Sequence, residues 1–134
     1  MNYWIIKSEP NTYSWEKLVK DGSTTWDGVR NYAARNNLKE MKKGDLVFIY
    51  HTGEEKSVIG IAKVEREWYA EPGDPEWVVV DLVPQKPLKR PVSLSEVKAE
   101  KLLKDMKLAR VPRLSVQPVT KNEFDFVVRI SEKK

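Results

Sequence analysis

The chain has 134 residues, of which 40% are hydrophobic and 33% are charged, so it is long enough for one domain with a hydrophobic core. It contains no cysteine and one histidine, which excludes disulfides and cysteine nucleophiles and argues against a transition-metal site. Its net charge of +4 is compatible with a polyanionic partner but does not establish one.

No signal for export or membrane insertion is found in the sequence. The first ten residues have too short an apolar run for a signal peptide, and no stretch approaches the roughly 20 apolar residues of a membrane span. We therefore expect a single domain over residues 1–134 that is soluble in the cytoplasm and does not bind a membrane.

The first half of the chain predicts two strands with two helices between them. Residues 3–7 (YWIIK) are β-branched or aromatic and precede Pro10, which favours a short strand. Ser14 is a good N-cap for a short helix, and a second helix is predicted over 31–41. Residues 46–51 (LVFIYH) are almost continuously apolar, which predicts a strand buried on both faces.

The second half predicts two long strands and two helices. The strands cover 58–68 and 77–83, and Gly60 within the first indicates a bend or a close approach. A capping box at 93–96 begins a helix whose inward face carries Ala99, Leu102, Leu103 and Met106. A second box at 120–123 begins a helix to about residue 130, after a loop rich in proline.

Long strands joined by hairpin-like loops favour an antiparallel sheet over alternating parallel units. The pattern therefore predicts a small α+β domain with a curled or barrel-like sheet.

The usual catalytic signatures are absent from the sequence. His51 is the single histidine, no GxSxG elbow accompanies it, and no nucleotide-binding glycine motif follows a strand. A lone histidine at a strand end is more often a packing or hydrogen-bonding residue than a catalytic one. We expect no catalytic residue, no metal and no cofactor.

Residues 24–37 (TTWDGVRNYAARNN) combine an aromatic ring with arginines and asparagines. Arginine binds phosphates, asparagine bonds base edges, and an aromatic face stacks on bases, which together indicate recognition of an extruded or single-stranded base. The alternative is that Asn31 caps the helix, Trp26 packs on the core and the arginines are solvated. The residues alone leave both interpretations open. The lysines at 98, 101, 104 and 107 have the spacing of a solvated helix face, which we prefer to a nucleic-acid contact.

Four motifs, in order, carry a family resemblance: YWIIKSEP (3–10), WDGVRNYAARNNLKEMKKGDLVFIYHT (26–52), VIGIAKV (58–64) and RLSVQPV (113–119). Together they resemble the EVE domain family. The resemblance implies a PUA-like fold, which is a small, curved, barrel-like and mostly antiparallel sheet flanked by helices. It also implies non-catalytic binding of a modified nucleobase, with modified cytosine in DNA as the leading proposal. The YTH domain, which is similar, reads a modified adenine in RNA, so the resemblance leaves DNA and RNA open.

The resemblance also assigns site residues by position. Trp26 and Tyr50 would form the walls of a pocket for a flipped base, and Asn31 would bond its Watson–Crick edge. The other residues expected around the pocket are Lys7, Ser8, Glu9, His51, Thr52, Arg113, Leu114 and Ser115. Contacts to the nucleic-acid backbone are expected from Arg30, Arg35, Lys42 and Lys43.

Two other functions stay open at this point. ASCH domains, which share the PUA-like fold, include hydrolases and nucleases for modified nucleosides or RNA, and here Lys7, Glu9 or His51 would act as acid or base. A protein-interaction module that binds a metabolite or a peptide is the third hypothesis. The oligomeric state is open, with a monomer as the simplest expectation.

Overall fold

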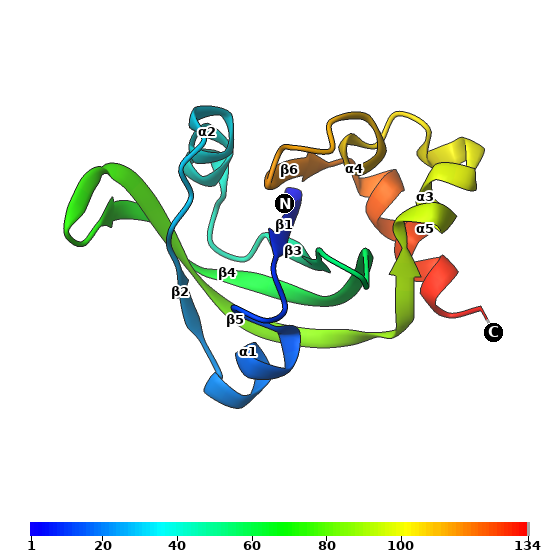
Figure 1. Cartoon of the computed structure of the whole chain (residues 1–134), viewed down its shortest axis with the longest axis horizontal. Helices are drawn as coiled ribbons and strands as arrows, with labels where there is room; N and C mark the ends of the chain where they lie inside the picture. Colours follow the sequence, from blue (N-terminus) through cyan, green and yellow to red (C-terminus); the bar gives the residue numbers. More distant parts are fainter. Residues whose placement is uncertain (134) are drawn as a thin grey trace.

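Six strands form one curved sheet in the order β2-β5-β4-β3-β1-β6 (Figure 1). The computed structural model describes residues 1–133. All neighbouring strands in it are antiparallel except β1 and β3, which are parallel. The predicted α+β fold with a mostly antiparallel sheet is confirmed, although the sheet stays open, with β2 and β6 at its edges. The strands are β1 (Tyr3–Ser8), β2 (Thr24–Trp26), β3 (Leu46–His51), β4 (Ser57–Glu71), β5 (Asp74–Ser93) and β6 (Val116–Val119).

Helices cover both faces of this sheet. Trp4 and Ile6 of β1 belong to one core cluster and Ile5 to another, because successive residues of a strand face opposite sides. The first cluster is covered by α1 (Trp15–Asp21) and α2 (Tyr32–Glu40). The second is covered by α3 (Leu94–Ala99), the 3₁₀ turn η1 (Lys101–Leu103), α4 (Lys107–Arg110) and α5 (Lys121–Ser131), which gather at one end of the sheet in Figure 1. Within residues 1–133, no helix combines the length and the apolar character that crossing a bilayer requires.

The predicted helix starts are confirmed. The Ser14 hydroxyl accepts a hydrogen bond from the backbone of Lys17 at 3.1 Å and begins α1. Capping boxes at Ser93 and Thr120 begin α3 and α5, each with a glutamate three residues later that accepts from the cap's backbone N–H. These side chains satisfy amide groups that a helix end leaves without partners.

The single helix predicted after Ser93 is wrong, because the chain breaks it at Glu100, whose backbone is extended. Leu102 is 70% exposed, and Ala99 is exposed too, so the predicted inward face is only half correct. The buried residues are instead Val97, Leu103, Met106 and Leu108. A continuous helix at 100° per residue could not point all four to one side, whereas the broken segment buries them together.

Two strand predictions also need correction. The strand predicted to end at Val83 continues to Ser93, through Pro84, Pro87 and Pro91. Because β2 pairs only with residues 80–82, the outer side of β5 beyond them has no strand partner, and proline is tolerated there. Residues 116–119, predicted as a loop, form the edge strand β6.

Gly60 marks a close approach, as predicted, and the group that approaches is the indole of Trp15. A Cβ atom at Gly60 would lie 2.6 Å from Trp15 Cε2, which is closer than real side chains pack. Trp15 is 5% exposed and begins α1, so its contact with Gly60 packs the first helix against strand β4.

We expect the Gly60→Ala substitution to lower the free energy of unfolding by about 1–3 kcal/mol, because the added methyl group overpacks the Trp15 contact. Urea denaturation measures this change. In a Trp15→Leu background the same substitution should cost less, since the clashing ring is gone. Equal costs in both backgrounds would contradict the proposed contact.

Candidate functional site

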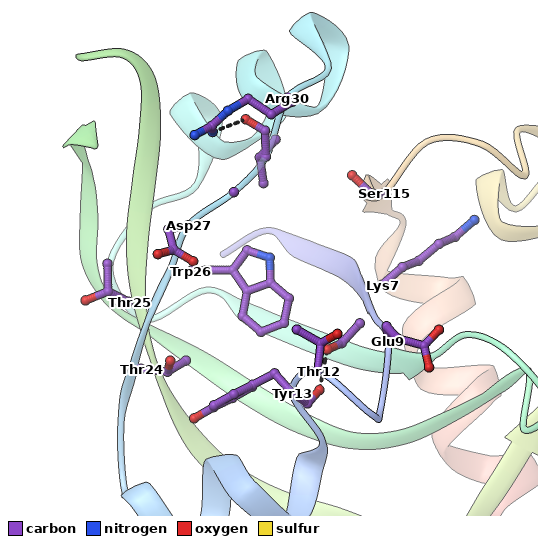
Figure 2. A pocket seen from close by; sticks show the side chains of 13 residues that line it. Lys7, Glu9, Thr12, Tyr13, Thr24, Thr25, Trp26, Asp27, Arg30 and Ser115 are labelled. Atoms are coloured by element: carbon purple, nitrogen blue, oxygen red, sulfur yellow. Dashed lines mark hydrogen bonds between the residues drawn. The ribbon is translucent and has the colours of Figure 1, made fainter. Parts of the chain in front are cut away.

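A cavity of about 380 Å³ opens between the end of β1 and the segment that joins β2 to α2 (Figure 2). This volume lies within the range of roughly 300–1,000 Å³ that small-molecule sites occupy. Residues from both ends of the sheet line it, since β1 and β2 are separated by three strands, so the cavity lies where the curved sheet fails to close. Its lining consists of Lys7, Ser8, Glu9, Thr12, Tyr13, Thr24, Thr25, Trp26, Asp27, Gly28, Val29, Arg30 and Ser115.

Trp26 is the central side chain of this cavity. It ends β2, is half-buried, and packs part of its indole against the first core cluster. Figure 2 shows the indole projecting among the labelled side chains. The ring of Tyr13 meets it edge to face, with the ring centroids 6.0 Å apart and the planes at 81°. Trp26 therefore packs on the core, as one of the two interpretations predicted, and it also lines the cavity, as the other requires.

The end of β1 forms the opposite wall. The Lys7 backbone N–H donates to Ser115 O at 2.9 Å, and its ammonium group donates to Pro112 O. Burial lowers the pKa of Lys7 from its ordinary 10.5. The Ser8 hydroxyl donates to Tyr13 O, so it holds the next loop in place and leaves only its lone pairs for a ligand.

Arg30 and Glu71 fix the loop that follows Trp26. Arg30 Nη1 and Nη2 donate to the two carboxylate oxygens of Glu71 at 3.0 and 2.5 Å, and Gly28 N donates to the same carboxylate at 3.0 Å. Gly28 has a φ of +79°, which favours glycine. The hydrogen bond from Arg30, followed by that from Gly28, lowers the pKa of Glu71 from its usual 4.5. Arg30 lines the cavity, but its charge is already paired, so it is a weaker phosphate ligand than predicted.

Asn31, which was predicted to bond a base, lies outside the lining of the cavity. Its side-chain oxygen accepts from Ala34 N at 3.0 Å as the N-cap of α2. Helix capping occupies one acceptor position of the Asn31 side chain.

Tyr50, His51 and Thr52 do not line the cavity, contrary to the prediction. Tyr50 is 4% exposed and belongs to the core cluster on the other face of the sheet, because it alternates with Ile49. His51 is buried, and its Nε2 accepts from Trp15 N at 3.0 Å while Nδ1 lies 3.2 Å from a Glu55 carboxylate oxygen. Thr52 bonds the backbone of Ser8 and the carboxylate of Glu9. These residues support the cavity wall from behind.

The remaining predicted residues lie at its margin or away from it. Arg113 is exposed, and Leu114 packs on the first core cluster beside Ser115. Arg35 donates to Glu76 O and covers the rings of Tyr32 and Trp77. Lys42 and Lys43 precede the start of β3, whereas the cavity adjoins the opposite end of β1, which runs parallel to β3. The pair therefore cannot form the rim of the cavity.

The sequence did not predict several lining residues, chiefly Tyr13, Thr12 and Asp27. Tyr13 follows Pro10 in a polar stretch just before a helix cap, and an aromatic residue in such a position is a usable signal. Asp27 directly follows Trp26, so its position beside the predicted stacking residue was the available signal.

The lining combines a flat aromatic ring with groups of both hydrogen-bonding kinds. Glu9 and Asp27 carry carboxylate acceptors and Ser115 a hydroxyl donor, whereas the Lys7 ammonium group points away from Trp26 in Figure 2 and donates to Pro112 O. Such a cavity can hold a planar, polar ring by stacking and edge hydrogen bonds.

Known proteins share the sequence and the fold of this chain. Thymocyte nuclear protein 1 of Gallus gallus is 35% identical over 98% of this chain and 69% of its own length. The structure of an Agrobacterium tumefaciens protein matches with a TM-score of 0.95 and 43% identity, over 98% of this chain and 94% of that one. The human THYN1 protein in complex with DNA containing 5-methylcytosine matches with a TM-score of 0.93 and 34% identity, over 100% and 99% of the two chains. The family model of the EVE domain matches residues 2–130. The chain therefore belongs to the EVE domain family.

Proposed function

We propose that this protein binds a modified cytosine of DNA, flipped out of the duplex into the cavity beside Trp26. The observation that carries the proposal is the half-buried indole of Trp26, which is fixed by the core on one side and faces a cavity on the other. The human relative in complex with DNA containing 5-methylcytosine supports the choice of nucleic acid and base.

Stacking supplies affinity that does not depend on sequence, because every base has an aromatic face. Trp26 is held by core contacts and by Tyr13, so little side-chain freedom is lost when a base stacks on it. The methyl group of a modified cytosine adds only about 0.8 kcal/mol when buried. Discrimination must therefore also come from hydrogen bonds at the base edge.

The carboxylates in the cavity match cytosine better than thymine. Cytosine carries an exocyclic amino donor where thymine carries a carbonyl acceptor, and Asp or Glu accepts from that amine. Asp27 and Glu9 are the carboxylates of the lining, and the Ser115 hydroxyl can donate to an acceptor of the same edge. A carboxylate facing thymine would lose its partner, which is the costly mismatch in a desolvated site.

The hydrolase alternative no longer has His51 as its acid or base, because that ring is 3% exposed and bonded at both nitrogens. Lys7 and Glu9 remain at the cavity and would have to carry such chemistry. Incubation with modified nucleosides and RNA tests it, since turnover that Glu9→Gln abolishes would favour hydrolysis over binding.

We expect the Trp26→Ala substitution to weaken binding to a duplex oligonucleotide with one 5-methylcytosine by about 1–3 kcal/mol, since a stacking face is lost. Fluorescence anisotropy at fixed salt measures this, with cytosine DNA and 5-methylcytosine RNA as further probes. Trp26→Phe, which retains a smaller ring, should retain part of the affinity.

Trp68→Ala is the matched control, because Trp68 is 45% exposed on β4 and does not line the cavity. It should leave affinity unchanged. Unchanged affinity of a folded Trp26→Ala variant would refute the proposal. A preference for the RNA probe would show that RNA, and not DNA, is the target.

We expect the Glu71→Gln substitution to lower both stability and affinity, since Arg30 and Gly28 lose the carboxylate that orders the loop after Trp26. The pKa of Glu71 is lowered in the folded protein, so its stabilisation is complete above the unfolded value near 4.5 and disappears as the pH falls through the folded pKa. The difference in Tm between wild type and variant should therefore shrink below about pH 4.5.

Glu96→Gln provides the control for this second experiment. Glu96 forms a similar bidentate pair with Arg90, far along the chain from the cavity, and its pKa is also lowered chiefly by that arginine. Both variants should lose Tm at neutral pH, whereas only Glu71→Gln should lose affinity for the 5-methylcytosine probe. Equal affinities in the two variants would show that the hydrogen bonds of Glu71 with Arg30 and Gly28 do not order the cavity.

A further inference from the structure

The positive charge of the chain is concentrated in one segment, residues 98–113. This segment carries six basic side chains and two acidic ones, a net of +4, which equals the net charge of the whole protein. The rest of the chain therefore carries eighteen basic and eighteen acidic residues, whose formal charges cancel. The six basic residues are Lys98, Lys101, Lys104, Lys107, Arg110 and Arg113.

All six of these basic side chains are exposed. Within residues 1–133, Arg110 alone among them forms an ion pair, with Asp105 at 3.3 Å, and both side chains of that pair are more than 60% exposed. Such an exposed pair is weak and exchanges readily with other ions. The broken path of α3, η1 and α4 buries Leu103, Met106 and Leu108 on one side, which leaves the lysines between them in solvent.

This basic segment leads directly into a wall of the cavity. Arg113 lies two residues before Ser115, which lines it, and Pro112 O accepts from the Lys7 ammonium group. The buried Gln117 amide donates to Val111 O at 3.0 Å and to Leu114 O at 2.9 Å, so the connecting loop is fixed. In Figure 1 the segment follows α3 and α4 toward β6, beside β1.

The wall formed by Trp26 and the loop after it has no comparable excess of positive charge. Arg30 is paired with Glu71 and lies 3.5 Å from an Asp74 carboxylate oxygen, whereas Arg35 donates to Glu76 O. Acidic and basic side chains alternate there, so a phosphate would meet repulsion as well as attraction.

We propose that residues 98–113 bind the phosphate backbone of the nucleic acid whose base enters the cavity, so that the strand leaves the cavity past Ser115 toward α4 and α3. The inference rests on the proposed function and adds the direction of the strand. Exposed lysines without ion-pair partners suit this role, because phosphate contacts release counterions and need no fixed geometry. The proposal adds a binding role to lysines that are solvated in the structure, as their spacing predicts.

The test compares two triple variants that lose the same three charges. Lys101→Gln, Lys104→Gln and Lys107→Gln are combined in one, and Lys86→Gln, Lys89→Gln and Lys133→Gln, all exposed and outside residues 98–113, in the other. Binding to duplex oligonucleotides with and without 5-methylcytosine is measured by anisotropy over a series of salt concentrations. Thermal unfolding confirms that both variants are folded.

We expect the first variant to reduce the slope of log K against log salt by up to about 2.7, since each phosphate contact contributes about 0.9. With affinities equal at 1 M salt, a slope change of about 2.7 corresponds at 0.1 M salt to a loss of up to roughly 500-fold in affinity, similar for both probes. The control variant should keep the wild-type slope. An unchanged slope in the first variant, or an equal decrease in the control, overturns the proposal and favours another partner for this surface, such as an acidic protein.

The design separates this inference from the proposed function. Equal binding of both probes by the wild type, together with a reduced salt slope in the first variant, would refute recognition of modified cytosine and support backbone binding by residues 98–113. If the wild type prefers the modified probe and the slope is unchanged in the first variant, recognition of modified cytosine is supported and backbone binding by residues 98–113 is refuted. No binding of either probe by the wild type refutes both.

Discussion

The position of β1 inside the sheet is the constraint on which the site depends. A first strand that pairs with β3 on one side leaves its other edge open, and β6, more than a hundred residues later, fills that edge. Because β6 runs antiparallel to β1, its start lies beside the end of β1, and Lys7 N bonds Ser115 O. The two ends of the domain thus meet at the cavity, so unfolding of the C-terminal part would remove one of its walls.

Trp26 stands across the cavity from this junction, where β2 forms the far edge of the sheet. An open sheet leaves its last strand with one bare edge and partly covered side chains. As a result, the core fixes part of the Trp26 indole while the rest of the ring faces the cavity. A closed barrel would bury the same ring and remove the cavity.

Local signals made much of the fold predictable, and contacts distant in sequence explain the errors. Helix starts at Ser14, Ser93 and Thr120 depend on side chains three residues apart, so the sequence shows them directly. The strand at 116–119 owes its pairing to β1, which no local pattern reveals. For the site, the resemblance correctly placed Trp26 and Ser115 at the cavity. It placed Tyr50 there wrongly, because Tyr50 faces the other side of the sheet from its neighbour Ile49.

The two walls of the cavity use positive charge in opposite ways. An arginine that orders a loop must be bound to a carboxylate, as Arg30 is to Glu71, and the pairing cancels the charge that a phosphate would seek. A lysine that attracts a polyanion must stay unpaired and solvated, as Lys101, Lys104 and Lys107 are, and such a residue contributes little to order. One residue rarely serves both purposes. The ordered, charge-paired loop therefore lies on the side of Trp26 and the unpaired basic side chains on the side of Ser115, and on our proposal this difference gives a bound strand a direction.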